Sequence, residues 1–396
     1  MNSVLMSSYD EKEKIMKDEP HDDWSPLEES ILKDQRRAYD DMRERCPVAH
    51  SEFMGWSIFR HEDIVTLLAD TTTFSNASQY MAIPNGIDPP DHSRYREALD
   101  SNFEQQEMGR IEPLARSIAV ALLEPALSGG NMEFINAFAN PFALKTLCAS
   151  LGWPEEQWEY LSGWVHGSQQ AAFNKDAVAG KDLANSFSEY VKANLDNRRA
   201  LSCNGKDATG VLLNTEIDGV RLDNDQIVSI LRNWTAGHGT VADSLGILVL
   251  HLAQETKLQD RLRSNPLLIP AAIEEILRVD GPLVANPRTT TRAVQIQGRS
   301  IPKGEHVTLM WISANRDSRV FDEPDAITIE RDTGNSLVWG QGAHLCQGAP
   351  LAKLEMRVAI EELLLRTNRF ELSDDDTPCR AVYPGNGIAK LPLRFN

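Results

Sequence analysis

Cysteine is scarce in this chain, with five among 396 residues. The spacing of Cys46, Cys148, Cys203 and Cys379 matches neither a zinc finger nor a disulfide framework, which suits a reducing compartment. No apolar run of about 20 residues occurs, so the sequence predicts no membrane-spanning helix. The polar segment up to Trp24 lacks the apolar core of a signal peptide. We therefore expect a cytoplasmic protein without a membrane partner.

Basic residues are also few: 40 lysines and arginines face 58 acidic residues, for a formal net charge of −18. Such a balance excludes general nucleic-acid binding, because phosphate backbones repel an acidic surface. With 41% hydrophobic residues, the chain can bury a large core. Neither repeats nor linkers rich in glycine, serine or proline interrupt it. We predict one domain over residues 35–396, after a polar, loosely ordered tail at 1–34.

Runs with strand character are few, and apolar residues recur mostly with helical spacing. The pattern predicts helices over 58–68, 110–127, 155–166, 186–200 and 351–365. Strands are expected within 55–59, 294–301 and 306–312. A longer helix, apolar nearly all round and therefore buried, is expected from about 223 to 251. The fold class is accordingly mainly α with a small β region.

Residues 339–348 form a glycine-punctuated loop, Trp-Gly-Gln-Gly-Ala-His-Leu-Cys-Gln-Gly, ahead of the helix expected at 351–365. The glycines let the backbone turn tightly and lie close to a flat partner. Amides at the following helix start favour the thiolate form of Cys346. A lone cysteine is usually a small buried hydrophobe, and one thiolate cannot close a zinc site. A single sulfur ligand with an open face suits haem iron.

Within the long helix lies a second unusual string, Ala236-Gly237-His238-Gly239-Thr240. Two glycines inside a helix cost about 1 kcal/mol each relative to alanine. This cost indicates either a local opening of the helix or the close approach of something bulky.

The loop at 339–348 resembles the haem-binding signature of the cytochrome P450 family, in which an aromatic residue, two glycines, a basic residue, the cysteine and a final glycine keep fixed spacing. The resemblance implies that Cys346 is the axial ligand of the iron of haem b. It also assigns to the haem surroundings Trp339, Gly340, His344 and Gly348. Trp339 stands where the family usually has phenylalanine, and Gln347 where an apolar residue normally follows the cysteine. Either change can alter the redox potential.

Further strings resemble the same family. Glu275 and Arg278 match its Glu-x-x-Arg helix, and Arg331 matches the third member of that structural network, which locks the cysteine loop. Alone, such an i,i+3 pair is usually a surface salt bridge. Residues 88–96 match the family's Pro-Pro-led helix, although read alone they place an i,i+4 pair on a solvated face. The resemblance implies that the haem propionates meet cationic or donor side chains, namely His92, Arg96, Arg288 and His344.

The string at 236–240 resembles the family's oxygen-binding groove. The resemblance implies that Ala236 lies against the haem and that Thr240 steadies bound dioxygen. The family's usual acid before the threonine is absent, because Gly239 occupies its place. Proton delivery must then come from elsewhere, and His238, Asp243 and a water chain are the candidates. His238 can equally face the next helix, and Asp243 can make an ordinary polar contact.

The resemblance implies a cytochrome P450 fold, with the haem buried between the long central helix and the helix after the cysteine loop. It implies a monooxygenase that inserts one oxygen atom of O2 into an organic substrate by hydroxylation, dealkylation or epoxidation. Electrons are expected from NAD(P)H through a reductase and a separate ferredoxin or flavodoxin. Lys353 and Arg357 are either contacts for that partner or ordinary solvated charges. A peroxide-driven enzyme of the same class and a non-enzymatic haem sensor or ligand carrier are the alternatives.

The substrate pocket is expected above the haem, with walls from the segment before Asp88, from the oxygen-groove helix and from the stretch after Pro282. Its predicted lining is Tyr80, Met81, Ile83, Ile87, Trp234, Ala236, Leu283, Val284, Ala285 and Asn286. This lining predicts a small, mostly apolar organic substrate with one polar anchor.

Overall fold

Helices make up most of the computed structural model, which describes residues 22–78, 82–200, 205–374, 376–381 and 385–395. Its helices are α1 (Glu29–Lys33), α2 (Gln35–Arg45), α3 (His61–Ala69), α4 (Asp91–Leu99), α5 (Gln105–Gly129), α6 (Asn140–Leu151), α7 (Trp158–Phe173), α8 (Ala177–Ala200), α9 (Ala208–Asn214), α10 (Asn224–Gln254), α11 (Thr256–Ser264), α12 (Ile269–Val279), α13 (Trp311–Ala314) and α14 (Ala349–Arg366). Its strands are β1 (Val48–Ser51), β2 (Gly55–Ile58), β3 (Phe74–Ser75), β4 (Asn131–Glu133), β5 (Glu216–Ile217), β6 (Val220–Arg221), β7 (Ala285–Thr290), β8 (Val294–Ile296), β9 (Arg299–Ile301), β10 (His306–Met310), β11 (Phe370–Leu372), β12 (Cys379–Arg380), β13 (Ile388–Lys390) and β14 (Pro392–Phe395). The predicted fold class, mainly α with small sheets, is confirmed.

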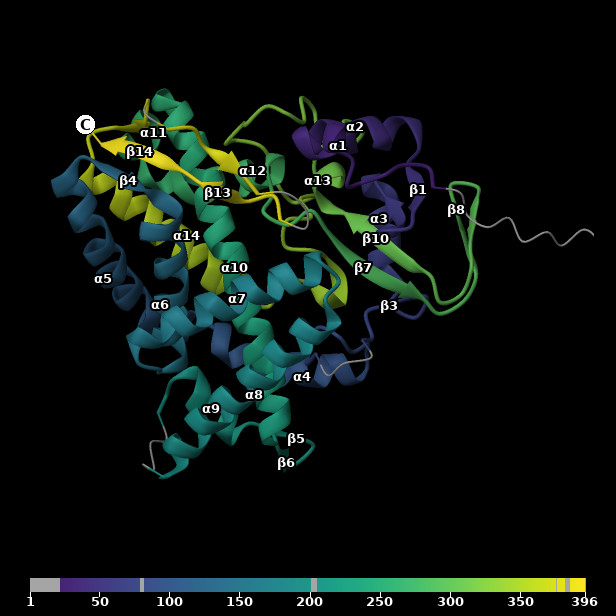
Figure 1. Ribbon diagram of the computed structural model, residues 1–396, viewed down its shortest axis with the longest axis horizontal. Helices are drawn as coiled ribbons and strands as arrows, with labels where there is room; N and C mark the ends of the chain where they lie inside the picture. The colour runs from purple at the N-terminus through teal and green to yellow at the C-terminus, as the bar shows by residue number, and fades with distance from the viewer. Residues whose placement is uncertain (1–21, 79–81, 201–204, 375, 382–384, 396) are drawn as a thin grey trace, which may run out of the picture.

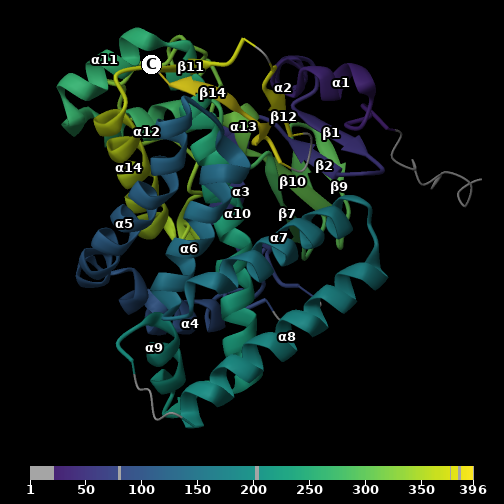
Figure 2. The same cartoon turned by 60° about the vertical axis from the view of Figure 1, so that its left-hand side comes forward.

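The long helix α10 crosses the middle of the helical part of the molecule, and α6, α12 and α14 pack on it (Figure 1; Figure 2). Asp223 and Gln226 form a capping box that satisfies amides at its start. Apolar residues occupy nearly every side of the helix, and Ile230, Leu245 and Leu248 are all buried. Such a helix has no polar face for solvent and must be covered by others. Neither α10 nor any other helix within the described ranges is both long and apolar enough to span a bilayer.

The largest sheet lies beside α1, α2 and α3, apart from the main group of helices (Figure 1). Its strand order is β1-β2-β10-β7-β3. β2 and β10 run parallel, whereas β10 and β7 run antiparallel, with Val307 opposite Arg288. Because side chains alternate along a strand, β7 presents Asn286 and Arg288 on the same face. The sheet therefore sets the position of one wall of the site described below.

The predicted helices begin at different residues in the structure, as two examples show. The helix expected over 58–68 begins at His61, because Ile58 still belongs to β2. The helix expected over 186–200 begins at Ala177. The sequence pattern does not predict α6, whose residues are apolar on almost every side and so show no helical period.

Two predicted strand regions are also divided. Over 294–301 the chain forms the hairpin of β8 and β9, which turns at Gln297 and Gly298, both with positive φ. The strand expected over 306–312 ends at Met310, where α13 begins. In both places a change of backbone direction interrupts a run that the sequence pattern reads as one strand.

The N-terminal segment predicted as a loose tail packs against the rest of the protein from residue 22 onward. Trp24 is buried, and its ring meets those of Tyr39 and Phe59 edge-on, with centroids 6.1 and 5.3 Å away. The amide of Asp23 donates to the carbonyl of His50 at 2.9 Å. Such contacts hold residues 22–34 to the first strand and the second helix, while residues 1–21 lie outside the described part.

Candidate active site

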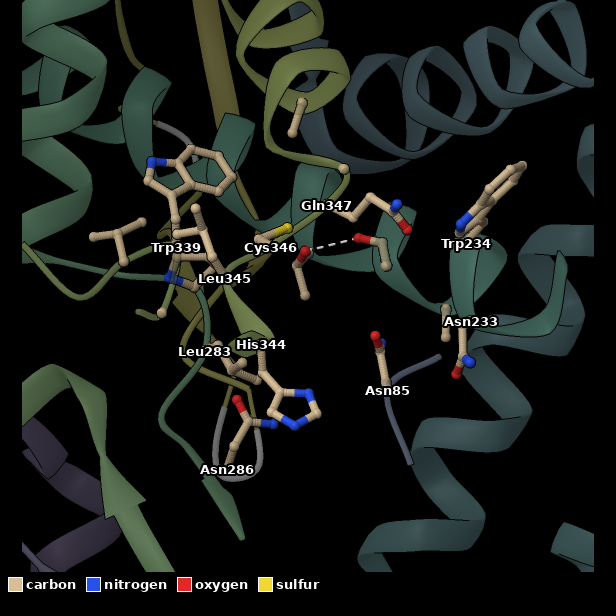
Figure 3. A pocket seen from close by; sticks show the side chains of 18 of the residues that line it. Asn85, Asn233, Trp234, Leu283, Asn286, Trp339, His344, Leu345, Cys346 and Gln347 are labelled. Carbon is tan, nitrogen blue, oxygen red and sulfur yellow. Dashed lines mark hydrogen bonds between the residues drawn. The ribbon is translucent and has the colours of Figure 1, made fainter. Parts of the chain in front are cut away.

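A cavity of about 580 Å³ opens between α10, the loop at 339–348 and the start of α14. Its wall is completed by the chain entering β7 and by Ala82, Pro84, Asn85 and Gly86 (Figure 3). Cys346 reaches this space from the loop, and Ala236 and Thr240 reach it from α10. The structure therefore brings together the two strings that stand out in the sequence.

The loop that carries Cys346 is a tight turn. Gly340 and Gly342 both have a φ of +72°, a conformation that other residues rarely adopt. A β-carbon at Gly342 would also lie 3.2 Å from the carbonyl oxygen of Leu68. The amide of Cys346 donates to the carbonyl of Trp339 at 2.8 Å and closes the turn. The glycines are therefore required by the backbone, as the sequence pattern indicates.

The sulfur of Cys346 is accessible, and the space beside it is the cavity. Burial raises the pKa of this thiol, whereas the amides of Gly348 and Ala349, which donate to the sulfur, and the charge of Arg96 act in the opposite direction. Among the described residues, no three His, Cys, Asp or Glu side chains group as a metal-ion site. An iron ligated here would have to bring its own equatorial ligands, as haem iron does.

Gln347, the residue after the cysteine, joins this loop to the helix before α5. Its side-chain nitrogen donates to Oδ1 of Asp100 at 2.9 Å and to the carbonyl of Arg96 at 3.1 Å. Gln347, which departs from the family pattern, therefore connects the cysteine loop to the end of α4.

Two arginines and two histidines gather near one edge of the cavity. Arg96 and Arg288 each donate to a backbone carbonyl, at 2.6 and 2.8 Å, and among the described residues neither has a carboxylate within ion-pair distance. Burial lowers the pKa of both guanidinium groups. The rings of His92 and His344 lie 4.2 Å apart, centroid to centroid. The structure thus assembles all four residues predicted to meet the propionates.

Within the described residues, the two histidines leave ring nitrogens unpaired. Both ring nitrogens of His92 and Nε2 of His344 are buried, with no hydrogen-bond partner in the described part of the chain. Burial and nearby cations lower the pKa of His92, and they lower that of His344 to about 4. Buried polar groups are normally paired, so this edge is suited to an anionic group. A flat molecule with two carboxylates, ligated by Cys346, satisfies both requirements; the residues present fit haem.

α10 runs unbroken through residues 236–240, so the opening considered from the sequence is absent. Gly237 has open space at the position of a β-carbon and lines the cavity. The hydroxyl of Thr240 donates to the carbonyl of Gly237 at 2.7 Å, also at the cavity wall. Gly237 therefore makes room for a close neighbour, the second possibility that the sequence raises.

Gly239 faces away from the cavity, toward α7. A β-carbon there would lie 3.0 Å from Cγ1 of Val165 and 3.2 Å from Nε2 of Gln169. Such distances are tighter than ordinary van der Waals contact. A larger side chain at position 239 would crowd α7. The glycine that stands in place of the acid therefore lies where α10 and α7 approach each other closely.

The two predicted proton donors lie in different places. Nδ1 of His238 is 2.8 Å from the carbonyl oxygen of Trp234, and its Nε2 is 3.6 Å from Oε1 of Glu355, at the cavity wall. Asp243 is not part of that wall; it packs against Gly387, where a β-carbon would clash with it. Burial raises the pKa of Asp243 to about 7. The structure thus places His238 at the cavity and Asp243 away from it.

The predicted Glu275–Arg278–Arg331 network is assembled. Arg278 donates to both oxygens of Glu275 at 2.8 and 2.9 Å, and Arg331 donates to the same carboxylate at 2.8 Å. The neighbouring Glu274 accepts a bond from Nε1 of Trp339 at 2.9 Å. α12 is therefore joined directly to the start of the cysteine loop.

The predicted substrate walls are partly correct. Those residues that line the cavity are Trp234, Ala236, Leu283 and Asn286. Those that do not are Ile83, Ile87, Val284 and Ala285. The backbone of Ile83 is held by the side-chain amide of Asn233, and its side chain packs into a core cluster. Val284 is completely buried in another cluster, while Tyr80 and Met81 lie outside the described residues.

The cavity wall also contains residues that the sequence analysis does not predict, among them Asn85, Asn233 and Glu355. Figure 3 shows Asn85 and Asn233 together on one side, with Asn286 and His344 across from them. The amides have no sequence signal of their own, because isolated asparagines are common in loops and helices. Glu355 has one, since it is an acid within the apolar stripe of α14, which it shares with Glu362, an acid paired with Arg116 and Arg366.

The two predicted partner contacts are both engaged within the chain. Lys353 forms an ion pair with Glu274 at 2.8 Å, and its side chain remains 48% exposed. Arg357 pairs with Glu112 at 2.8 Å and with Glu361 at 3.0 Å. Lys353 is therefore the more available of the two for a partner.

Comparisons with known proteins agree with this geometry. The family model described as Cytochrome P450 matches residues 157–396. Erythromycin C-12 hydroxylase from Saccharopolyspora erythraea is 34% identical, over 86% of this chain and 88% of that protein. Cyclomarin C epoxidase CymV from Salinispora arenicola is 32% identical, over 84% of this chain and 89% of that protein. The structure of open cytochrome P450 EryK from S. erythraea superposes with a TM-score of 0.85 at 30% identity, covering 92% of this chain and 97% of that one.

Proposed function

The chain belongs to the cytochrome P450 family and is a monooxygenase of organic substrates, and from that premise we propose that Cys346 binds the iron of haem b. The observation that carries the proposal is the sulfur of Cys346 open to the cavity, with the Thr240 stretch of α10 forming another part of the same wall. Arg96, Arg288 and His344 would hold the propionates from the same cavity.

When bound, haem supplies the oxygen chemistry: one atom of O2 enters the substrate and the other leaves as water. The protein's own groups prepare the site. The amides of Gly348 and Ala349 stabilise negative charge on the sulfur of Cys346. Thr240 places a hydroxyl at the wall of the groove, where it can donate to oxygen instead of to Gly237. Apolar side chains on α10 exclude water from the rest of that wall.

The substrate that suits this cavity is an organic molecule, mostly apolar, with a hydrogen-bonding group. Asn233 uses its amide nitrogen on the carbonyl of Ile83, and Asn286 uses its oxygen on Nε1 of Trp311. The opposite ends of these two amides, with the side chain of Asn85, are left to meet a ligand. Two relatives are named for the hydroxylation of erythromycin and the epoxidation of cyclomarin C, which are likewise organic substrates.

Electrons come, in this proposal, from NAD(P)H through a reductase and a ferredoxin or flavodoxin. The need for this coenzyme favours action in the cytoplasm, where it is made and reduced. Lys353, beside the helix start that carries the cysteine loop, is the charge best placed to steer the partner.

The proposal is tested by screening organic compounds for a low-to-high-spin shift of the ferric holoenzyme and then assaying the binders with a ferredoxin and its reductase under isotopically labelled dioxygen. We expect one haem b per chain, a long-wavelength Soret band of the ferrous carbonyl adduct, and product carrying one labelled oxygen atom. Haem-free protein, or binders that never acquire labelled oxygen, would contradict it.

A peroxide-driven enzyme of the same class is the second candidate, and the glycine at position 239 favours it. Hydrogen peroxide already carries the protons that O2 must acquire, so the lack of an acid in the oxygen groove slows the peroxide-driven reaction less. Turnover with hydrogen peroxide and none with the reductase chain would select this alternative.

Thr240→Ala is expected to lower the product formed per NAD(P)H by about fivefold, the equivalent of one hydrogen bond of about 1 kcal/mol, with a matching rise in released peroxide. The matched control is Thr235→Ala, on the same helix. Its hydroxyl donates to the carbonyl of Leu231 at 2.8 Å and is buried away from the cavity. Equal coupling in the Thr240→Ala and wild-type enzymes would remove the role assigned to Thr240.

A further inference from the structure

Glu355 is a buried acid that the fold does not explain. It lies on α14 where α14 packs against α10 (Figure 1), and its side chain is 0% exposed. Among the described residues, no hydrogen-bond partner reaches either of its oxygens. Nε2 of His238 lies 3.6 Å from Oε1, and among the described residues that nitrogen is likewise buried without a hydrogen bond. Buried acids are rare unless paired, so this pair calls for a function.

The environment determines where the protons reside. Burial raises the pKa of Glu355 well above that of a free glutamate, and no charged neighbour opposes this effect. Burial also lowers the pKa of His238 to about 4, against the effect of its bond to the carbonyl of Trp234. Burial therefore favours the neutral carboxylic acid at Glu355 and the neutral imidazole at His238. Because Nδ1 must carry the hydrogen donated to Trp234, Nε2 presents its lone pair to Glu355.

The position of the pair matches what the oxygen groove lacks. Glu355 and His238 line the same cavity as Thr240 and Ser244. Ser244 donates to the carbonyl of Thr240 at 2.6 Å, so these two residues form one polar strip along the groove. Gly239 supplies no acid to that strip, and Asp243 is outside the cavity. Within the described cavity wall, Glu355 is the one carboxyl group.

We propose that Glu355 is the proton donor to the oxygen groove of this enzyme and that His238 is its positioning residue. The inference rests on the proposed function. Each turnover takes O2, two electrons from the reductase chain, two protons and substrate R–H to R–OH and water. In the donation step the O–H bond of Glu355 breaks, and the proton passes through cavity water to the oxygen being reduced.

His238 acts before and after that step. Its Nε2 lies 3.6 Å from Oε1 of Glu355, so a shift of less than about 1 Å brings the two within hydrogen-bond distance, and Nε2 then accepts from the Glu355 hydroxyl and orients the acid. Once Glu355 has become a carboxylate, the negative charge beside the imidazole raises the pKa of His238. The imidazole then takes up a proton that bulk solvent supplies along cavity water and passes it to the carboxylate, which restores the starting state for the second proton.

Glu355→Gln tests the donor because it keeps the shape of the side chain and removes the transferable proton. Reductase-driven product formation is expected to fall about 100-fold, the lower end of general-acid effects. Peroxide-driven product formation should stay within about twofold of wild type, since hydrogen peroxide brings both protons on its own oxygens. Equal losses with both oxidants would show a merely structural role, and no loss with either would show no role; each result overturns the proposal.

Control variants separate this pair from its neighbours. Glu361→Gln makes the same change further along α14, on a side chain that pairs with Arg116 and Arg357 outside the cavity, and should match wild type with both oxidants. His238→Leu should lose about tenfold with the reductase chain, and combining it with Glu355→Gln should add no further loss. Additive losses would contradict positioning. A loss confined to Asp243→Asn would assign proton donation to that residue instead.

Infrared spectroscopy of the resting holoenzyme provides a readout that needs no turnover. We expect a protonated-carboxyl C=O band that shifts in D2O, moves in His238→Leu and is missing in Glu355→Gln. Absence of that band overturns the proposal whatever the activity. If the wild-type enzyme shows the band yet forms no product with the reductase chain, it is the proposed function that fails.

Discussion

Substituting serine for Cys346 is expected to abolish reductase-driven product formation, down to the level of a reaction without enzyme. The serine hydroxyl stays protonated at neutral pH, so it offers iron neither the negative charge nor the electron donation of a thiolate. The ferrous carbonyl adduct should lose its long-wavelength Soret band, and haem content after gel filtration should fall. Absorption spectroscopy and product assays on the same preparation measure all three effects.

The matched control for this substitution is Cys379→Ser, which alters an exposed free cysteine outside the cavity. It should retain wild-type haem content, spectrum and activity. Because the side chain of Cys346 faces open space, the haem-free Cys346→Ser protein should unfold at nearly the same urea concentration as the haem-free wild type. A thiolate-type spectrum in Cys346→Ser would refute the ligand assignment and with it the proposed function.

Glu275→Gln is expected to lower the free energy of unfolding by about 3–5 kcal/mol, because it leaves the buried guanidinium of Arg278 and the largely buried one of Arg331 without their shared carboxylate. Arg278 and Glu275 are both 0% exposed, and Arg331 is 13% exposed. The amide of Thr328 also donates to Glu275 at 3.0 Å. Urea unfolding followed by circular dichroism measures the loss. Haem should also dissociate faster, since the network holds the segment that leads into the cysteine loop.

The contribution of Glu275 to the stability of the fold depends on pH. Burial acts to raise the pKa of Glu275, but bonds from Arg278, Thr328 and Arg331 outweigh burial and lower it below its ordinary value. A depressed pKa stabilises the fold at pH values above that of an unfolded glutamate, about 4.3, and this contribution disappears as the pH falls further. The difference in stability between wild type and Glu275→Gln should therefore shrink on acidification.

Glu330→Gln is the comparison for the Glu275 substitution. Glu330 forms an ion pair with Arg261 at the surface, where its side chain is 62% exposed. Exposed pairs contribute little to stability, so the urea midpoint should not move. If Glu275→Gln left the urea midpoint as little changed as Glu330→Gln, the buried network would not stabilise this protein.

Short-range patterns predict the parts of this site that depend on local spacing. The glycines before Cys346 indicate a tight turn, and the turn is there with φ of +72° at Gly340 and Gly342. The i,i+3 spacing of Glu275 and Arg278 places both on one helix face, where they bond. Element boundaries such as that at His61 are less well predicted, since strand and helix share the same apolar residues.

The direction of side chains at the pocket wall is not predicted by local spacing, because it depends on which neighbouring segments pack against each residue. Ile83 and Val284 look like wall residues in sequence, yet both turn into core clusters. Asn233 and Asn85 face the cavity instead. A shift of one residue along a loop or strand turns a side chain from the cavity wall into the core. No local sequence pattern determines which of the two directions a side chain takes.

By itself the sequence determined the cysteine loop, the central helix and the network, because each depends on residues a fixed number of positions apart. Only the tertiary structure decided that Gly239 faces α7, that Asp243 lies outside the cavity, and that His238 meets Glu355 from a distant helix. Those relations are set by how α7, α10 and α14 pack. Helix packing depends on the sum of many weak contacts, and no single spacing in the chain records it.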